Sequence, residues 1–212
     1  MPRSLTQITD LTAAEVQEIF DLCGKMKRKE IAPKPLAGKA VACIFTKASL
    51  RTRVSFEVGI QQLGGNALYI TDNEIKLGER ESVADVARVL SRYVGMIMIR
   101  TFKQSDVEGL AKYASVPVVN GLTDAVHPCQ ILGDYFTILE HKSPQRKYKV
   151  AYLGDGNNIT HSWLNLASLI PLDLRIATAP DCRPEALYVE KARKNPQSTV
   201  LLTDDPKEAV AG

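Results

Sequence analysis

The sequence predicts an α/β fold made of two doubly wound parallel-sheet domains, the second of them incomplete. Short apolar runs of strand length alternate with segments of helix length, and glycines and capping residues separate them. The alternation restarts after a polar stretch near residue 145. Strands that alternate with helices form parallel sheets covered on both faces. The predicted domains are residues 1–142 and 143–212.

Four strands and four helices are expected in the first domain. Three of the helices are marked by a capping residue or a terminal glycine pair. The turn residues of 120–124 predict a loop before the last helix. The predicted strands are 41–45, 67–70, 96–99 and 116–119. The predicted helices are 52–63, two that open at Ser82 and Ser105, and 131–140.

The polar, proline-containing stretch 141–149 is the predicted linker. Beyond it, strands are expected at 150–153, 174–178 and 200–203, and helices at 160–169 and 184–194. The pattern reaches Gly212 shortly after a helix start at Asp205, and for this reason we expect the second domain to be incomplete.

Charge and cysteine content narrow the class of protein. The net charge is +3, and acidic and basic residues are interspersed, which argues against a nucleic-acid partner. The longest apolar runs are too short to span a bilayer, and the N-terminus lacks the apolar core of a signal peptide. The four cysteines are scattered, without metal-ligand spacing. We therefore expect a cytoplasmic protein with no metal, no cofactor and no membrane partner.

Polar residues that directly follow a strand are the first candidates for a site, because ligands of open α/β sheets bind beyond the carboxyl ends of strands. The first such cluster is S-L-R-T-R, residues 49–53, at the start of a predicted helix. A helix N-terminus, hydroxyl groups and guanidiniums together attract an anion, and phosphate is the expected ligand. In isolation, the same residues would be an ordinary helix cap with solvated arginines.

Two further clusters follow strands in the same domain. Arg100 comes directly after the apolar run 96–99, where it can reach the anion bound by the first cluster. The segment His127-Pro128-Cys129-Gln130 precedes a helix, so His127 can polarise a carbonyl oxygen while Gln130 binds an amide nitrogen. A softer candidate is G-D-G-N-N at 154–158, which is not the dinucleotide fingerprint.

Taken in order, FTKASLRTRVSFE, ESVADVARVLSRY, MIRTF, HPCQILGDYF and GDGNNITHSWLNLAS closely resemble ornithine carbamoyltransferases, from about Leu5 to the last residue. The resemblance implies transfer of the carbamoyl group of carbamoyl phosphate to L-ornithine, in a trimer whose sites lie between subunits. Lys76 would complete a neighbour's site, where the family usually has Gln. The substrate contacts that the resemblance implies are Ser49, Leu50, Arg51, Thr52, Arg100, His127, Pro128, Cys129 and Gln130 for carbamoyl phosphate, and Asn158 for ornithine.

The resemblance also sets an expectation about activity. Chains of this family continue with an ornithine-binding Ser-Met-Gly loop and a His-Cys-Leu-Pro segment, and neither motif occurs in this sequence. We therefore expect very little turnover from residues 1–212 alone. Two alternatives stay open: a non-catalytic module that binds carbamoyl phosphate or another anion, and a carbamoyltransferase for a different amine.

Overall fold

The computed structural model describes residues 3–211 and divides the chain into two compact units. The first unit runs to Thr6 and then contains Glu18–Asp124; the second contains Gln7–Gln17 and everything from Ala125. Helix α6 (Pro128–His141) thus belongs to the second unit, whereas the predicted domain boundary follows this helix. Within the described residues, no helix is long and apolar enough to cross a membrane.

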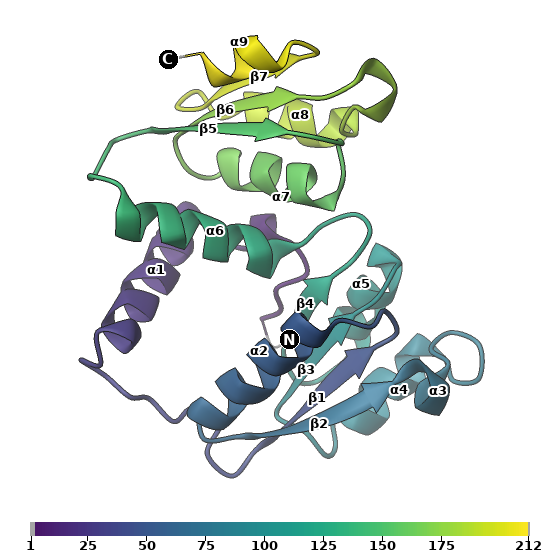
Figure 1. The fold of residues 1–212 in the computed structure, drawn as a ribbon. Coiled ribbons are helices and arrows are strands. Elements are labelled where there is room, and N and C mark those ends of the chain that lie inside the picture. The colour runs from purple at the N-terminus through teal and green to yellow at the C-terminus, as the bar shows by residue number, and fades with distance from the viewer. Residues whose placement is uncertain (1–2, 212) are drawn as a thin grey trace. The chain divides into compact units, whose positions relative to one another are not determined.

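The first unit is built on a four-stranded parallel sheet (Figure 1). Its strands are β1 (Ala40–Phe45), β2 (Asn66–Thr71), β3 (Met96–Arg100) and β4 (Val118–Leu122), in the spatial order β2-β1-β3-β4. The chain moves from β1 outward to β2 and then returns to the other side of β1 as β3. The sheet therefore has a topological switch point between β1 and β3, where ligands of such folds bind.

Both faces of this sheet are apolar, as expected for a doubly wound domain. In β1, Ala42 and Ile44 belong to one buried cluster, and Val41, Cys43 and Phe45 belong to a second cluster on the other face. Since successive side chains of a strand point to opposite faces, the continuous apolar run of β1 is explained by burial on both sides. The helices of this unit are α2 (Leu50–Gln62), α3 (Asp72–Ile75), α4 (Val83–Leu90) and α5 (Gln104–Tyr113).

Of the two helix starts predicted from a capping serine, one agrees with the structure and one does not. Ser82 caps α4, and its hydroxyl accepts a hydrogen bond from the backbone N–H of Asp85, so this prediction is confirmed. The predicted cap at Ser105 is wrong, because α5 already begins at Gln104. The Gln104 side chain accepts a hydrogen bond from Thr123, a long-range contact that the local sequence pattern does not reveal.

Strand β4 lies further along the chain than predicted. We expected a strand at 116–119 and a loop from residue 120, but β4 continues to Leu122. The N-terminal segment extends the pairing, because Leu5 forms a bridge with Val119 and its carbonyl accepts from the N–H of Asn120. The loop prediction was wrong because turn residues can continue a strand when a distant segment supplies partners.

Helix α1 (Ala13–Lys27) is the largest element that the sequence reasoning did not predict. Its start carries a reciprocal capping box: Glu15 accepts from the backbone N–H of Thr12, and Thr12 accepts from the backbone N–H of Glu15. The T-A-A-E spacing at 12–15 is the signal that could have identified this helix.

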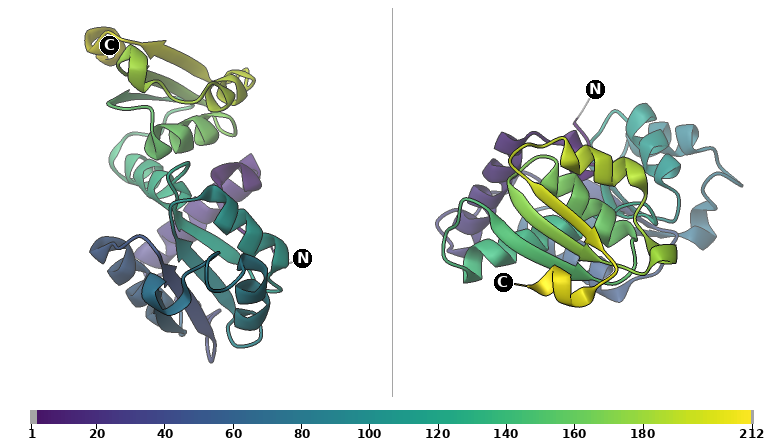
Figure 2. Two further views of the ribbon diagram at one scale, coloured as in Figure 1. Left: turned by 90° about the vertical axis from the view of Figure 1, so that its right-hand side faces the viewer. Right: turned by 90° about the horizontal axis from the view of Figure 1, so that it is seen from above.

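The second unit contains a three-stranded parallel sheet in the order β5-β6-β7, which the right-hand view of Figure 2 shows side by side. Helices α7 and α8 lie on one face of it and α9 on the other (Figure 1). A short helix, η1 (Ile8–Asp10), packs on α7. The remaining bounds are β5 (Tyr148–Leu153), α7 (Asn158–Ala167), β6 (Leu172–Ala177), η2 (Pro180–Cys182), α8 (Ala186–Arg193), β7 (Thr199–Thr203) and α9 (Pro206–Val210). The prediction of parallel sheets in two units is confirmed.

Candidate active site

The switch point of the first sheet brings the first two predicted clusters together. In the register of this sheet, Phe45 at the end of β1 pairs with Arg100 at the end of β3. Four residues after Phe45, Ser49 is the N-cap of α2. The chain therefore folds a helix N-terminus and a guanidinium onto the same edge of the sheet.

The start of α2 has the geometry of an anion-binding helix N-terminus. Ser49 is extended, its hydroxyl accepts from the backbone N–H of Thr52 at 3.4 Å, and it donates to the Thr52 hydroxyl at 3.0 Å. No acidic residue lies in the first turn. The side chain of Leu50 is 78% exposed, so only its backbone can serve the site. The first N–H groups of a helix have no partner within it and carry partial positive charge.

Arg100 adds a partly buried cation to this helix start. Its Nη1 donates to the hydroxyl of Thr52 at 3.2 Å. The register between β3 and β4 shifts between Ile99 and Arg100, and such irregularities redirect side chains beside functional sites. The Nε atom of Arg100 is buried and has no hydrogen-bond partner among residues 3–211.

The charges of this cluster are unbalanced. Burial, and then the nearby charge of Arg51, lower the pKa of the Arg100 guanidinium. Within the described part of the chain, no ion pair offers a carboxylate to Arg51 or Arg100. Two guanidiniums held close enough to repel one another would be stabilised by an anion between them. We name Ser49, Leu50, Arg51, Thr52 and Arg100 the anion cradle.

Arg53 has a different environment from Arg51, although only two residues separate them. Its Nε donates to Glu57 at 2.9 Å, and its guanidinium lies 3.8 Å from the ring centroid of Tyr69. These contacts engage the guanidinium of Arg53. They lie beside a cavity of about 510 Å³, which is lined by Arg53, Glu57, Gln61, Gly65, Asn66, Ala67 and Tyr69. Of the two arginines in the motif, Arg51 is therefore the one available to the cradle.

Two residues at the same sheet edge were not predicted as site residues. The hydroxyl of Thr46 donates to the hydroxyl of Thr101 at 2.9 Å and so joins the ends of β1 and β3. The ammonium of Lys47 forms an ion pair with Asp124 at 2.7 Å and lies over the ring of Phe102. Both follow β1 directly, and the rule that polar residues after strands form sites could have found them.

Lys76 stands apart from the cradle within the first unit. It follows α3 in the left-handed conformation, with φ 42° and ψ 61°, and its side chain is exposed. Among residues 3–211, no hydrogen bond or ion pair joins it to the cradle. Its predicted role toward a neighbouring subunit stays a prediction.

The third cluster begins α6 in the second unit. His127 is the N-cap and Pro128 is the first helical residue, a position where the missing N–H of proline costs nothing. Gln130 is exposed, and its amide nitrogen donates to Asp134 one turn later at 2.7 Å. In this orientation the carbonyl oxygen of Gln130 faces away from Asp134 as an acceptor, the group required to bind an amide N–H.

Cys129, between Pro128 and Gln130, is half-buried. Burial raises its pKa to about 11. Because the thiolate is the reactive form of cysteine, a thiol with this pKa is a poor nucleophile near pH 7. The structure thus favours a packing role for Cys129.

The G-D-G-N-N segment turns tightly between β5 and α7. A Cβ atom on Gly156 would lie 2.0 Å from the backbone nitrogen of Pro184, so only glycine fits there. The side chain of Asn157 caps α7 by accepting from the N–H of Ile159 at 2.9 Å. This turn places Asn158, the predicted ornithine contact, as the first residue of α7.

The structure therefore gathers the predicted residues into two groups. Ser49, Thr52 and Arg100 are in direct contact in the first unit. His127 to Gln130 and Asn158 begin two helices of the second unit. No group of three or more metal-ligating side chains occurs in the part of the chain that the structure describes.

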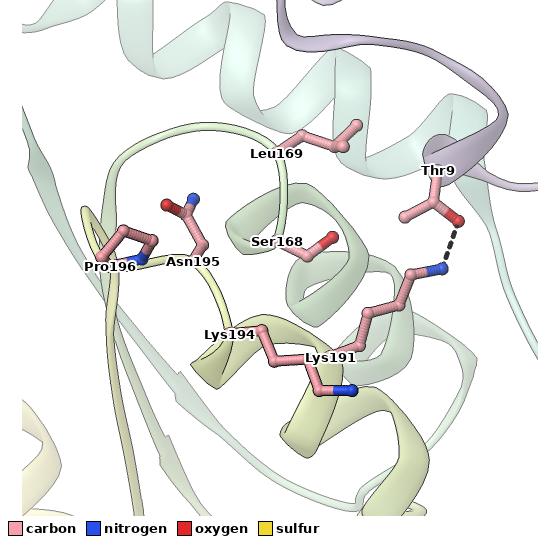
Figure 3. Close-up of a pocket in the computed structure, with 7 residues that line it drawn as sticks. All are labelled: Thr9, Ser168, Leu169, Lys191, Lys194, Asn195 and Pro196. Atoms are coloured by element: carbon pink, nitrogen blue, oxygen red, sulfur yellow. Dashed lines mark hydrogen bonds between the residues drawn. The ribbon is translucent and has the colours of Figure 1, made fainter.

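A separate cavity of about 440 Å³ lies in the second unit, where α7 and α8 end (Figure 3). In the close-up, the ammonium of Lys191 points toward Thr9, to whose hydroxyl it donates at 2.7 Å. Lys191 lies in the last turn of α8 and Lys194 caps it, where cations complement the partial negative charge of a helix C-terminus. None of the predicted site residues lines this cavity.

Two family models match the chain. Residues 3–140 match the carbamoyl-phosphate-binding domain of aspartate/ornithine carbamoyltransferases, and residues 146–212 match the aspartate/ornithine-binding domain of the same family. The unmatched segment between them lies within the predicted linker.

Curated relatives and solved structures agree with this match. An ornithine carbamoyltransferase of Carboxydothermus hydrogenoformans is 48% identical over 99% of this chain and 70% of its own length. A chloroplastic ornithine carbamoyltransferase of Pisum sativum is 52% identical over 84% of this chain and 48% of its own. The solved ornithine carbamoyltransferase of Pyrococcus furiosus superposes with a TM-score of 0.91 at 42% identity, covering 98% of this chain and 68% of that one.

Proposed function

The chain belongs to the aspartate/ornithine carbamoyltransferase family, and from that premise we propose that it transfers the carbamoyl group of carbamoyl phosphate to the δ-amino group of L-ornithine. The products are L-citrulline and phosphate, and the reaction is a step of arginine metabolism. The observation that carries the proposal is the anion cradle, with its unpartnered buried Nε on Arg100.

The cradle supports the phosphate half of this assignment. A phosphate at the start of α2 would accept from first-turn backbone N–H groups and from the hydroxyls of Ser49 and Thr52. The guanidinium of Arg51 would offset its charge. Arg100 donates to Thr52 at 3.2 Å, so its remaining N–H groups lie within reach of the same ligand.

The start of α6 supports the carbamoyl half. We assign to His127 and Arg100 the carbonyl oxygen of the substrate, and to the carbonyl oxygen of Gln130 the carbamoyl N–H₂. The hydrogen bond from Gln130 to Asp134 favours this assignment, because it orients the amide with its acceptor free. Pro128 and Cys129 would line the ligand through the backbone and through packing.

These positions suit the chemistry of carbamoyl transfer. The neutral δ-amine attacks the carbonyl carbon, the bond from that carbon to the phosphate oxygen breaks, and the amine releases a proton. Negative charge grows on the carbonyl oxygen and on the departing phosphate. Donors fixed at both oxygens stabilise the transition state more than the ground state. A neutral Cys129 fits direct transfer without a covalent intermediate.

We further propose a homotrimer, in which the exposed face of α2 lies against another copy of the chain. Leu50, Val54 and Val58 recur every fourth residue along this helix and are 78%, 48% and 45% exposed. A contiguous apolar stripe of this kind is typical of a protein interface. Light scattering should give three times the 23.3 kDa chain mass, and Val54→Lys should shift it toward monomer.

The proposed reaction is tested by calorimetry and by citrulline formation. Residues 1–212 should bind carbamoyl phosphate, and a chimera that adds the remaining C-terminal part of the Carboxydothermus relative should form citrulline from carbamoyl phosphate and ornithine. Binding without turnover in the chimera would favour the anion-binding module. Turnover with an acylated ornithine or with aspartate, but not with ornithine, would favour another amine. Absence of binding would refute the proposal.

A further inference from the structure

Two consecutive residues of α7 hold the segment that carries His127. His161 and Ser162 are 4% and 0% exposed, and both side chains hydrogen-bond to backbone atoms of residues 125–127. All of these residues belong to the second unit. Neither side chain was predicted to serve the site, since H-S-W contributed only to the family resemblance.

Ser162 links the starts of two helices through one hydroxyl. The backbone N–H of His127 donates to Ser162 Oγ at 2.7 Å. The same hydroxyl donates to the carbonyl oxygen of Asn158 at 2.7 Å. Both the donor and an acceptor position of the hydroxyl are thus in use, and the N-cap of α6 is fastened to the first residue of α7.

His161 provides a second attachment two residues earlier. Its Nε2 receives the backbone N–H of Glu185 at 3.1 Å, and its Nδ1 lies 2.9 Å from the carbonyl oxygen of Ala125. An N–H can donate only to an unprotonated ring nitrogen, so the proton must lie on Nδ1, which donates to Ala125. The imidazole also stacks on Tyr188 at 4.2 Å, which fixes the plane of the ring.

The backbone of His127 is therefore held on both sides. On its amino side, Ser162 and His161 fix the N–H of His127 and the carbonyl of Ala125. On its carboxyl side, Pro128 restricts the residue before it, and the carbonyl of His127 accepts from Ile131. The backbone position of His127, and with it the point from which its imidazole extends, is thus fixed by contacts within the second unit.

We propose that Ser162 is a positioning residue: it sets the place of the His127 imidazole through the backbone and couples it to the turn that carries Asn158, with His161 as the supporting attachment. The role of His127 toward the carbamoyl group rests on the proposed function; the attachment itself does not. Because one hydroxyl joins the carbamoyl-side and amine-side segments, a displacement of either segment is transmitted to the other.

The attachment is tested first without any ligand, by amide hydrogen exchange of residues 1–212. The His127 amide should be protected in the unchanged chain, and Ser162→Ala should speed its exchange about tenfold, because the hydrogen-bond acceptor is removed. Ser168→Ala is the matched control: Ser168 is the C-cap at the other end of α7, and its hydroxyl donates to the carbonyl oxygen of Asn165 instead of holding residues 125–127. An unprotected His127 amide in the unchanged chain, or equal exchange in Ser162→Ala, would overturn the proposal.

Nuclear magnetic resonance of the three histidines adds a measurement that needs no variant. The ¹⁵N shifts of His161 should report a proton on Nδ1 and none on Nε2, as its two hydrogen bonds require. A proton on Nε2 of His161 would refute the supporting attachment, because Nε2 could then not accept from Glu185. His141, in the last turn of α6, is the internal reference.

Ligand affinity then tests the consequence for the site. Ser162→Ala should weaken carbamoyl phosphate about tenfold and inorganic phosphate less than twofold, since phosphate alone needs only the cradle. Ser168→Ala should change neither. Equal weakening of both ligands would mean a general structural role and would overturn positioning. If the unchanged chain binds no carbamoyl phosphate while the exchange result holds, the proposed function fails and the attachment stands.

Discussion

The two units share the same alternation of strand and helix, yet each positions its predicted site residues differently. In the first unit the strand order reverses between β1 and β3, and the reversal alone brings Arg100 to the start of α2. The second sheet follows chain order, β5-β6-β7, with no reversal among its described strands. Its site residues are instead placed by loops fastened to α7. Residues placed by strand order should therefore tolerate substitutions in nearby loops, whereas residues placed by loop packing should not.

The largest expected effect comes from a substitution that disrupts the loop packing of the second unit. Gly156→Ala places a Cβ atom 2.0 Å from the nitrogen of Pro184, so backbone must move, at a cost of about 3 kcal/mol in the free energy of unfolding. Urea denaturation measures this cost. Phosphate binding by the cradle, in the other unit, should stay within twofold under native conditions.

Gly133→Ala is the control for that substitution. Gly133 lies within α6, and a Cβ there meets nothing within 4 Å, so alanine should stabilise the unit by about 0.5–1 kcal/mol. If both glycine variants changed the free energy of unfolding alike, close packing at Gly156 would not be what shapes the loop.

The next largest effect tests the topological site. Arg100→Ala removes the guanidinium that spans the switch point and should weaken carbamoyl phosphate about 100-fold, or about 2.7 kcal/mol, as expected for a buried charge-assisted contact. Isothermal titration calorimetry measures it. Arg175→Ala in β6, whose guanidinium pairs with Asp173, is the matched control and should bind normally. A loss below threefold in Arg100→Ala would place the ligand elsewhere.

A smaller effect distinguishes the two arginines of the motif. Arg51→Gln should weaken inorganic phosphate about tenfold, or about 1.4 kcal/mol, because its charge is uncompensated. Arg53→Gln should change phosphate affinity less than twofold, because Arg53 is occupied by Glu57 and Tyr69. The reverse ranking in a titration would show that the cradle opens on the other side of α2.

The same contrast explains what the sequence could predict. The existence of every described strand follows from local apolar patterns, and the rule for strand ends predicts that Arg100 lies near the start of α2, because these features depend on sequence neighbours and topology. The start of α5 depends on the contact of Gln104 with Thr123, and the end of β4 depends on backbone pairing with Leu5, and both contacts form only in the fold. The attachment of His127 to Ser162, 35 residues away, is of the same kind. Helix α1 was within reach through its capping box.

The smallest expected effect concerns Cys129, a predicted site residue whose raised thiol pKa makes it a poor nucleophile near pH 7. Burial raises its pKa to about 11, so the thiol stays protonated as pH rises from 7 to 9 and becomes a thiolate only well above that range. Cys129→Ser should therefore change carbamoyl phosphate affinity less than about threefold, with the same flat dependence between pH 7 and 9. Calorimetry at the two pH values checks this. If affinity in the unchanged chain altered between pH 7 and 9 and the serine variant abolished that change, the thiol would be titrating, and the loop-built part of the site would be more open to solvent than its packing indicates.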